Sequence, residues 1–216
     1  MRQNNPTCPL CKTDRAHDYF SDQTRDYYRC QICQLIFVLP SQFLSANDEK
    51  ARYDLHNNSS DDPKYRQFLS RTFNRIQTCI PPGSHGLDFG SGPGPTLSVM
   101  FEQAGHRMEI YDPYYAKDPS VLQRQYDFIT ATEVLEHIHN PAADLNRLWT
   151  CLKPGAILGI MTKSVFDKNR FSRWHYKDDP THVCFYSMST FKWLACQWQA
   201  DLTIADKDVI LIEKNR

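Results

Sequence analysis

The sequence lacks any long run of apolar residues and any excess of charge of one sign. Its 25 lysines and arginines balance 25 aspartates and glutamates. The charges are spread along the chain, which disfavours nucleic acid and membrane surfaces as partners. No stretch approaches the roughly 20 apolar residues of a membrane helix. Residues 1–6 contain no apolar signal region, so we expect a cytoplasmic protein. The balanced charge favours a neutral small molecule as the partner.

The eight cysteines do not indicate a disulfide framework, because nothing in the sequence points to an oxidising compartment. Four of them, Cys8, Cys11, Cys30 and Cys33, form two C-x2-C pairs that are separated by 18 residues. With two residues between the thiolates, each pair can supply two of the four ligands of a tetrahedral ion. The pattern predicts a zinc ribbon with structural Zn²⁺, since four thiolates leave no open position for catalysis. The alternative is four cysteines without a metal.

The length of 216 residues suits one domain of ordinary size with a small appendage. We expect a zinc-ribbon module over residues 1–42, with a short hairpin between its two cysteine pairs. A helical cover and linker follows over residues 43–82, and residues 65–78 have the spacing of apolar residues typical of a helix. Residues 83–216 are expected to form the main domain.

Glycine is scarce, with eight residues, yet Gly90, Gly92 and Gly94 come together directly after a short apolar strand. Glycine permits positive φ angles and lets a ligand lie against bare backbone at the carboxyl end of a strand. A dinucleotide fingerprint would need another glycine at Pro95, which has no free N–H. The segment therefore predicts a cofactor site of a different kind from that of the dehydrogenases.

An acidic residue ends the next expected strand. Residues 105–112 read as a strand that ends at Asp112, about 18 residues beyond Gly94. Nucleotide-binding folds place near this position the acid that binds both ribose hydroxyls. Alone, Asp112 and Pro113 would be read as a turn at the end of a strand. Together with the glycine turn, they predict a ribose contact.

The D-x-G-x-G-x-G segment and the sequence YDFITATEVLEH at residues 126–137 resemble the class I S-adenosylmethionine-dependent methyltransferases of the small-molecule type. The resemblance covers about residues 68–214, with the motifs in the family's order. It implies an α/β fold, a Rossmann-like doubly wound sheet of seven strands with a terminal antiparallel hairpin, beside the small ribbon. It also implies S-adenosylmethionine as cofactor. The implied contacts are Asp88, Gly90, Ser91, Gly92, Gly94, Asp112, Pro113 and Glu133.

Residues 133–148 are expected to form one helix directly after the fourth strand of the main domain. As a residue of the first helical turn, Glu133 would also be favoured by the helix dipole. His137 lies one turn further on, and we interpret it as a packed or surface histidine rather than a catalyst.

Residues 163–187 form an unusually long connection, and loops of this length tend to be functional covers. Their aromatic residues carry large apolar areas that should be buried or stacked on a ligand, so we expect a cover over the substrate. His182 is the first candidate for general base and His175 the second, because imidazole titrates near neutral pH. Asp179 either orients His182 or contacts the substrate. The alternative is that this pair only stabilises the loop.

These features predict an enzyme that transfers a methyl group from S-adenosylmethionine to a small organic acceptor, on oxygen, nitrogen or carbon. One alternative is an RNA or protein methyltransferase that docks a macromolecule through the zinc ribbon. Another is a non-catalytic scaffold that binds the cofactor. The identity of the acceptor and the oligomeric state are not predicted.

Overall fold

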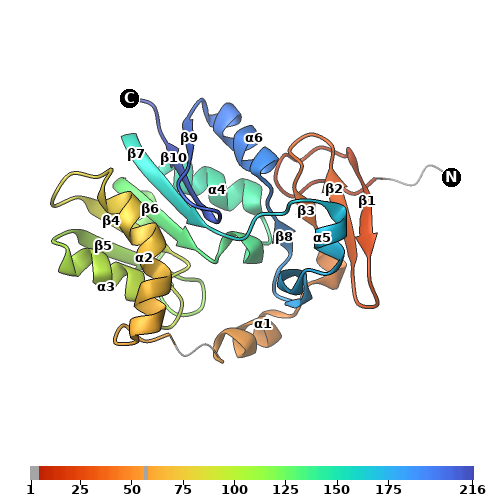
Figure 1. The fold of residues 1–216 in the computed structure, drawn as a ribbon, viewed down its shortest axis with the longest axis horizontal. Helices are drawn as coiled ribbons and strands as arrows, with labels where there is room; N and C mark the ends of the chain where they lie inside the picture. Colours follow the sequence, from red (N-terminus) through yellow and green to blue (C-terminus); the bar gives the residue numbers. More distant parts are fainter. Residues whose placement is uncertain (1–4, 56–57) are drawn as a thin grey trace.

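The fold of the chain, given by a computed structural model, is described for residues 5–55 and 58–216. Residues 1–4, part of the stretch that lacks a signal region, and residues 56–57 lie outside the described residues. A six-stranded sheet forms one end of the molecule and a small β-module forms the other (Figure 1). Within the described residues, no helix combines the length and the apolar character needed to cross a membrane.

The large sheet has the strand order β5-β4-β6-β7-β10-β9. These strands are β4 (His85–Phe89), β5 (Arg107–Tyr111), β6 (Tyr126–Thr132), β7 (Leu152–Met161), β9 (Asp201–Ile204) and β10 (Val209–Glu213). The first four in chain order are parallel, and β10 pairs antiparallel with both β7 and β9. The Rossmann-like sheet and its terminal hairpin are therefore confirmed.

The sheet differs from the expectation in having six strands rather than seven. Only residues 112–125 connect β5 to β6. They contain a single bridge, between Asp112 and Ala116, and a 3₁₀ turn at Val121–Gln123. A further parallel strand would need another crossover of a dozen or more residues in addition to its own length. The connection is too short for this, so β5 is the edge strand.

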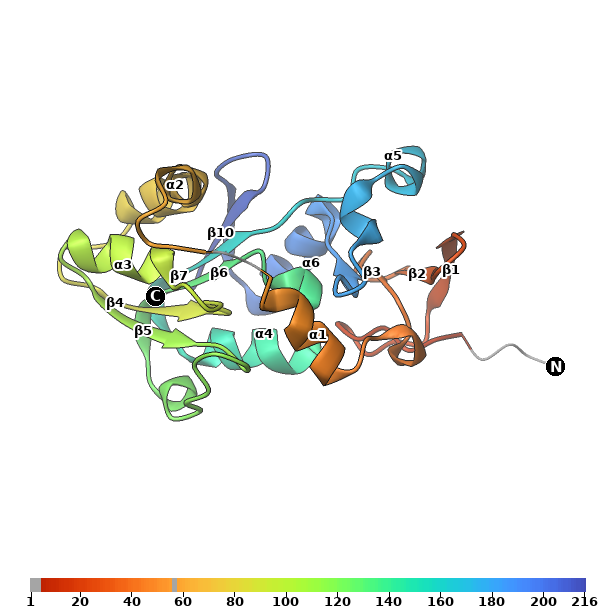
Figure 2. The same ribbon diagram turned by 90° about the horizontal axis from the view of Figure 1, so that it is seen from below.

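Helices cover both faces of the sheet, as Figures 1 and 2 show. On one face, α2 (Pro63–Gln77) and α3 (Thr96–Gln103) bury side chains such as Ile76 and Phe101 against Phe128 of β6. On the other face, α4 (Pro141–Thr150) and α6 (Met188–Trp198) pack on the alternate residues of the same strands. The two-sided burial explains the continuous apolar runs in these strands.

The expected helix over residues 133–148 is wrong. Residues Leu135–His137 form a separate 3₁₀ turn, and α4 begins only at Pro141. Proline is well suited to the first turn of a helix, where its missing N–H has no intrahelical partner, but it disrupts a helix interior. The break frees Glu133 to Ile138 from helical geometry and turns several of their side chains towards the carboxyl ends of the strands.

The small β-module combines the cysteine-rich N-terminus with a distant segment. The sheet order is β1-β2-β3-β8, where β1 is Ala16–Ser21, β2 is Asp26–Cys30, β3 is Ile36–Phe37 and β8 is Cys184–Phe185. The predicted hairpin between the cysteine pairs is β1–β2. The strand β8 lies in the connection between β7 and α6, so the ribbon shares its sheet with the main domain. The proposed boundaries at residues 42 and 82 stay a prediction.

The long connection at residues 163–187 serves mainly as the platform for the ribbon. It contains α5 (Lys168–Ser172), a 3₁₀ turn at His175–Asp178, and β8. The ring of Phe171 packs edge-on against Tyr19 and Tyr27 of the ribbon, and Phe185 also contacts Tyr27. Phe171 and Phe185 are thus buried against the ribbon, which is one of the two outcomes expected for the aromatic residues of this connection.

Residues 43–82, the expected helical cover, follow the ribbon in the chain. After a 3₁₀ turn at Pro40–Gln42, α1 (Ala46–Tyr53) begins at Ser45, whose hydroxyl accepts a hydrogen bond from the amide of Asp48. Figure 2 shows α1 between the ribbon and the sheet, and α2 above the sheet. Two helices are therefore present in this stretch, and its role as a cover stays a prediction.

Candidate active site

A cavity of about 610 Å³ lies at the carboxyl ends of β4, β5 and β6. Open α/β sheets bind ligands at this edge. The predicted residues Gly90, Ser91, Gly92, Asp112, Pro113, Glu133, Asp179 and His182 all line the cavity. The predicted residues Asp88, Gly94 and His175 do not line it.

The glycine turn is held in place by its backbone conformation and by one close contact. Gly90 has a φ of +75°, and its amide donates a hydrogen bond to the carbonyl of Tyr111 at 2.7 Å. A Cβ atom at Gly90 would lie 2.4 Å from Cγ2 of Val134. Only glycine satisfies both requirements, because it permits the positive φ and leaves room for the Val134 side chain.

Asp112 organises the opposite side of the turn. Its Oδ2 accepts a hydrogen bond from the amide of Gly92 at 2.9 Å. Its Oδ1 accepts from the amides of Tyr114 at 2.8 Å and Tyr115 at 3.1 Å. A carboxylate offers about four acceptor positions, so one remains for a ligand hydroxyl. The Asp112 carboxylate therefore ties β5 to the glycine turn and can still contact a ligand.

Two hydroxyls in the cavity wall fit a polar ligand. The Oγ of Ser91 and the Oγ1 of Thr132 are buried and have no hydrogen-bond partner within residues 5–55 and 58–216. Buried polar atoms almost always find a partner, so a pair of orphans in one cavity indicates that a ligand supplies it. Together with Asp112, these groups suit the polar atoms of a nucleoside such as the one in S-adenosylmethionine.

Asp88 and Gly94 support the turn from behind. The Asp88 carboxylate is buried beneath the turn and accepts hydrogen bonds from Thr130 Oγ1 at 2.6 Å and Ser98 Oγ at 3.2 Å. Burial raises the pKa of Asp88 to about 6. A Cβ atom at Gly94 would lie 1.9 Å from the carbonyl oxygen of Asn58, so this glycine allows the chain before α2 to approach.

Glu133 enters the cavity at the end of β6. Its φ of +52° lies in the left-handed region, which is rare for residues other than glycine and tends to occur at functional sites. The carboxylate accepts a hydrogen bond from the Tyr176 hydroxyl at 3.4 Å. Burial, reinforced by the negative charge of Glu136, raises the pKa of Glu133 to about 8. It is therefore largely protonated at neutral pH.

His182 is buried and fixed at one nitrogen. Its Nδ1 lies 2.6 Å from the main-chain oxygen of Tyr176. A carbonyl oxygen only accepts, so Nδ1 carries the proton and the lone pair of the neutral ring is on Nε2. Burial and the nearby His137 lower the pKa of His182 to about 4, so the ring is neutral at pH 7.

The two other candidates of this segment have different surroundings. The Asp179 carboxylate accepts hydrogen bonds from the amide and hydroxyl of Thr181, at 2.9 and 2.7 Å. These bonds outweigh burial and lower the pKa of Asp179. Its carboxylate therefore shapes the turn before His182 rather than bonding to the imidazole. His175 is exposed and lies outside the cavity lining.

Helix α1 closes the cavity through a carboxylate that sequence reasoning missed. The Glu49 carboxylate accepts hydrogen bonds from the Tyr53 hydroxyl at 2.9 Å and the Tyr114 hydroxyl at 2.7 Å. His139 Nε2 lies 3.3 Å from the same carboxylate. Although burial acts in the opposite direction, these contacts keep the pKa of Glu49 below its usual value. The network joins α1 to the loops that follow β5 and β6.

Sequence reasoning also missed Glu136, which lines the cavity beside His182 together with the packed histidine His137. The rings of His137 and His182 meet edge-to-face with 4.6 Å between their centroids. Glu136 is fully buried and accepts a hydrogen bond from the Thr162 hydroxyl at 2.9 Å. The signal was the E-x-x-E-H pattern, whose side chains converge only because the chain leaves helical geometry after β6.

The ribbon holds the His182 segment through one buried side chain. Arg25, just before β2, donates from Nη1 to the carbonyl oxygens of His182 at 2.9 Å and Pro180 at 3.3 Å. Its Nη2 donates to the carbonyls of Asp179, at 2.9 Å, and Lys177. A planar guanidinium can serve several acceptors in fixed directions. Arg25 therefore connects the ribbon to the wall of the cavity.

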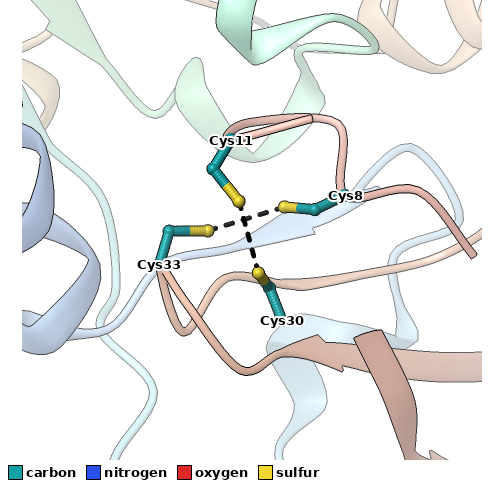
Figure 3. A group of neighbouring side chains, drawn as sticks. All are labelled: Cys8, Cys11, Cys30 and Cys33. Carbon is teal, nitrogen blue, oxygen red and sulfur yellow. Dashed lines mark hydrogen bonds between the residues drawn. The ribbon is translucent and has the colours of Figure 1, made fainter. Parts of the chain in front are cut away.

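The four predicted cysteine ligands meet at the open end of the β1–β2 hairpin, opposite its turn (Figure 3). Their sulfur atoms all lie within 4.8 Å of one another, with Cys8 and Cys33 at 3.5 Å and Cys11 and Cys30 at 3.3 Å. A tetrahedral ion with sulfur ligands at about 2.3 Å needs sulfur atoms about 3.8 Å apart. The predicted clustering is confirmed, and its dimensions fit a metal ion.

The two cysteine pairs have matching backbones. Lys12 and Gln34 each follow the second cysteine of a pair and have φ values of +59° and +62°. Their amides donate to the carbonyls of Cys8 and Cys30 at 3.0 and 3.1 Å. Two equivalent turns that present their thiols to one point form the geometry of a ribbon with two knuckles.

A Rossmann-like sheet with an antiparallel terminal hairpin, a glycine turn after its first strand and an acid after its second defines the class I methyltransferase fold. The family model described as "Methyltransferase domain" matches residues 60–206, and the chain belongs to this family. A curated relative, the ubiquinone biosynthesis O-methyltransferase of Aeromonas salmonicida (strain A449), is 29% identical over 82 residues. The match covers 37% of this chain and about a third, 34%, of the relative.

Solved structures share the fold. The 1,6-didemethyltoxoflavin-N1-methyltransferase of Burkholderia thailandensis, solved with 1,6-didemethyltoxoflavin and S-adenosylhomocysteine, has a TM-score of 0.52 and 14% identity. The similarity covers 94% of this chain and all of the other. An S-adenosylmethionine-dependent methyltransferase from Archaeoglobus fulgidus has a TM-score of 0.52 and 15% identity over 64% of this chain and 71% of its own. At these identities the similarity concerns the fold.

Proposed function

We propose that the protein transfers the methyl group of S-adenosylmethionine to a small organic acceptor. The observation that carries this proposal is one cavity that joins the glycine turn and Asp112 to Glu133 and His182. Its volume of about 610 Å³ lies within the range of small-molecule sites, about 300–1,000 Å³. When bound, S-adenosylmethionine supplies a methyl group that is already electrophilic on its sulfonium. The protein then has to hold the acceptor in line, exclude water and remove a proton.

The residues of the glycine turn are suited to hold the cofactor. The spare acceptor position of Asp112 would receive one of the two hydroxyl groups of the ribose, which is a neutral diol. Ser91 and Thr132 would bond with polar atoms of the cofactor, because their hydroxyls lack a partner among the described residues. Gly92 leaves the backbone bare at this wall, since only Asn58 Nδ2, at 3.9 Å, lies near its Cβ position. Asp88 and Gly94 would act indirectly, by keeping the turn in place.

The acceptor is expected at the end of the cavity that Glu133, Asp179 and His182 line. A neutral imidazole with its lone pair on Nε2 can serve an acceptor hydroxyl, whereas the largely protonated Glu133 can donate a hydrogen bond to it. Helix α1 would keep water out through the buried contact of Glu49 with Tyr114. We propose no direct role for His175, which lies outside the cavity lining.

The cysteine cluster is proposed to hold structural Zn²⁺. Four thiolates at tetrahedral spacing leave no coordination position for a substrate. The ribbon has a small core of its own, so the metal would contribute much of its folding free energy. Through β3, β8 and Arg25 the metal would also stabilise the segment that contains His182.

A macromolecular acceptor is the alternative that the structure makes less attractive. The contacts of Glu49 in α1 with the loops after β5 and β6 narrow the access to the cavity. The ribbon packs inward, on residues 163–187, instead of presenting this face to a partner. A salt-dependent gel shift with RNA would support the macromolecular alternative, and unchanged RNA mobility at low salt would support the small acceptor.

The cofactor part of the proposal is tested by calorimetry with S-adenosylhomocysteine. Asp112→Asn should weaken binding by at least tenfold, because an amide cannot accept from Gly92, Tyr114 and a ribose at once. The matched control is Asp118→Asn, an exposed carboxylate whose hydrogen bond is local, to the amide of Ser120. Equal affinities of wild type and Asp112→Asn would contradict the cofactor assignment.

The acceptor part is tested with radiolabelled S-adenosylmethionine and cell extract fractionated by size. We expect label in the fraction of small molecules. Label confined to RNA or protein would favour the macromolecular alternative. Normal cofactor affinity with no labelled product in any fraction would favour a non-catalytic scaffold.

A further inference from the structure

We propose that Glu136, His137 and His182 bind a divalent transition-metal ion at the acceptor end of the cavity, separate from the cysteine cluster. One potential ligand atom from each of these residues lies within 4.8 Å of the other two. All three residues line the cavity. Two imidazoles with one carboxylate form a donor set that first-row divalent ions such as Mn²⁺, Fe²⁺ and Co²⁺ accept, with positions left open for substrate.

The imidazole rings of His137 and His182 are each oriented by a carbonyl oxygen near Nδ1, as is usual for metal-binding histidines. His182 Nδ1 lies 2.6 Å from the carbonyl oxygen of Tyr176, and His137 Nδ1 lies 3.3 Å from that of Thr181. A metal-binding histidine generally donates its second nitrogen to a carbonyl or carboxylate, which fixes the tautomer and the ring plane. Both carbonyls belong to the segment that Arg25 clamps. The supporting contacts are thus present on both rings.

The carboxylate is oriented in the same way. Glu136 Oε2 accepts from the Thr162 hydroxyl at 2.9 Å, and Oε1 accepts from the Tyr176 hydroxyl. Each oxygen keeps a further lone pair for a metal ion. The hydrogen bonds of Glu136 therefore fix the direction of its carboxylate and leave a lone pair on each oxygen for a metal ion.

A cation would also balance charge that the protein itself does not balance. Glu136 is fully buried, and its hydrogen-bond donors are neutral hydroxyls. Within residues 5–55 and 58–216, no lysine or arginine forms an ion pair with it. The Asp179 carboxylate adds a negative charge to the same end of the cavity. Burying a carboxylate is costly unless it is paired or bound to a metal, so this end of the cavity suits a cation.

The bound ion would define the acceptor as a hydroxyl compound, an inference that rests on the proposed methyl transfer. The acceptor hydroxyl binds the open position of the ion. The ion lowers the pKa of this hydroxyl, which then releases its proton to water. The resulting oxygen attacks the methyl carbon as the carbon–sulfur bond breaks and the electron pair stays on sulfur. The products are a methyl ether and S-adenosylhomocysteine. In this arrangement His182 acts as a metal ligand, which replaces its direct contact with the acceptor hydroxyl.

The experiment measures Mn²⁺ binding to the full protein with its cysteine cluster loaded with Zn²⁺, by electron paramagnetic resonance of free Mn²⁺. Manganese suits carboxylate and imidazole ligands better than thiolates, so it reports this site. We expect one equivalent to bind, and His182→Ala and Glu136→Gln each to weaken it by at least tenfold. His175→Ala is the matched control, since this exposed histidine lies in the same segment. Its affinity should equal that of wild type.

Retained S-adenosylhomocysteine binding shows which variants are folded, and His137→Asn replaces any variant that fails this check. Absence of Mn²⁺ binding by wild type, or equal binding by wild type and the folded ligand variants, would overturn the metal site. Methyl transfer that survives in the absence of Mn²⁺ and other added divalent ions would also overturn it while leaving the proposed function intact. Stoichiometric Mn²⁺ binding without any methyl transfer would support the site and count against the proposed function.

Discussion

The guanidinium of Arg25 donates a hydrogen bond from Nη1 to the carbonyl oxygen of His182 at 2.9 Å, although 157 positions separate the two residues in the chain. The same guanidinium serves the carbonyls of Lys177, Asp179 and Pro180. The N-terminal ribbon is therefore a structural part of the cavity wall, and its integrity should control how the acceptor is held.

Replacement of Arg25 by glutamine should lower kcat/KM for methyl transfer by about tenfold or more. The variant loses charge-assisted hydrogen bonds to four carbonyls, each of which contributes about 1.5–3 kcal/mol. Small displacements of positioning groups have large effects on rate. S-adenosylhomocysteine affinity should stay within about twofold of wild type, because Gly90 and Asp112 are untouched. The control is Arg29→Gln, since the Arg29 guanidinium lies over the Tyr19 ring instead of the carbonyls. Equal loss in both variants would refute a specific role of Arg25.

Replacement of Gly90 by alanine should destabilise the protein and weaken cofactor binding. The new Cβ would lie 2.4 Å from Val134 Cγ2, and the alanine would have to adopt the φ of +75° that Gly90 has. Overpacking costs about 1–3 kcal/mol and left-handed backbone about 1–2 kcal/mol. Gly105→Ala separates the two costs, because Gly105 has a φ of +87° with nothing within 4 Å of its Cβ position. Urea unfolding should show a larger loss for Gly90→Ala, and calorimetry should show weaker S-adenosylhomocysteine binding only for that variant.

The pH dependence of stability should contain a contribution from Asp88. Its pKa is about 6 in the folded protein, compared with 3.8 for an aspartate in an unfolded chain. Because the folded pKa is raised, the stabilising contribution is fully present below pH 4 and is lost as the pH rises through 6. The loss amounts to about 3 kcal/mol at pH 7. Asp88→Asn carries no charge, so the difference in unfolding free energy between it and wild type should shift by this amount between pH 4 and 7. A constant difference would contradict the raised pKa.

Removal of one cysteine from the cluster should disrupt both the metal site and the acceptor end. Purified wild type should contain about one equivalent of zinc, and Cys11→Ser should contain much less, because four ligands are needed for a closed site. The ribbon of Cys11→Ser should become sensitive to protease, and methyl transfer should fall because β3 holds β8. Cys79→Ser, at an exposed free cysteine, is the control. Wild type with less than about half an equivalent of zinc and freely reactive thiols would argue against the metal site.

Much of the main domain was predictable because its elements follow local rules. The strand expected to end at Asp112 matches β5, and the helix expected over residues 65–78 matches α2, since the apolar spacing of each marks it. The missing strand after β5 could not be anticipated from the resemblance, because it depends on the length of one connection. The break after Glu133 was not anticipated either, because the periodicity of Leu145 and Leu148 masked it.

The sequence by itself determined the positions where backbone geometry and ligand chemistry are local: the C-x2-C pairs, the glycine turn and Asp112 at the end of its strand. These depend on neighbours within a few residues, so spacing suffices to find them. Only the tertiary structure decided the acceptor end, where Glu49, Glu136, His137 and His182 meet from three separate segments. Packing decided it, because Phe171 and Phe185 of the segment 163–187 pack on the ribbon, whereas Asp179 and His182 line the cavity. What the histidine in DPTHVCFYS contacts is thus set by Arg25 and Tyr176, which no local pattern connects to it.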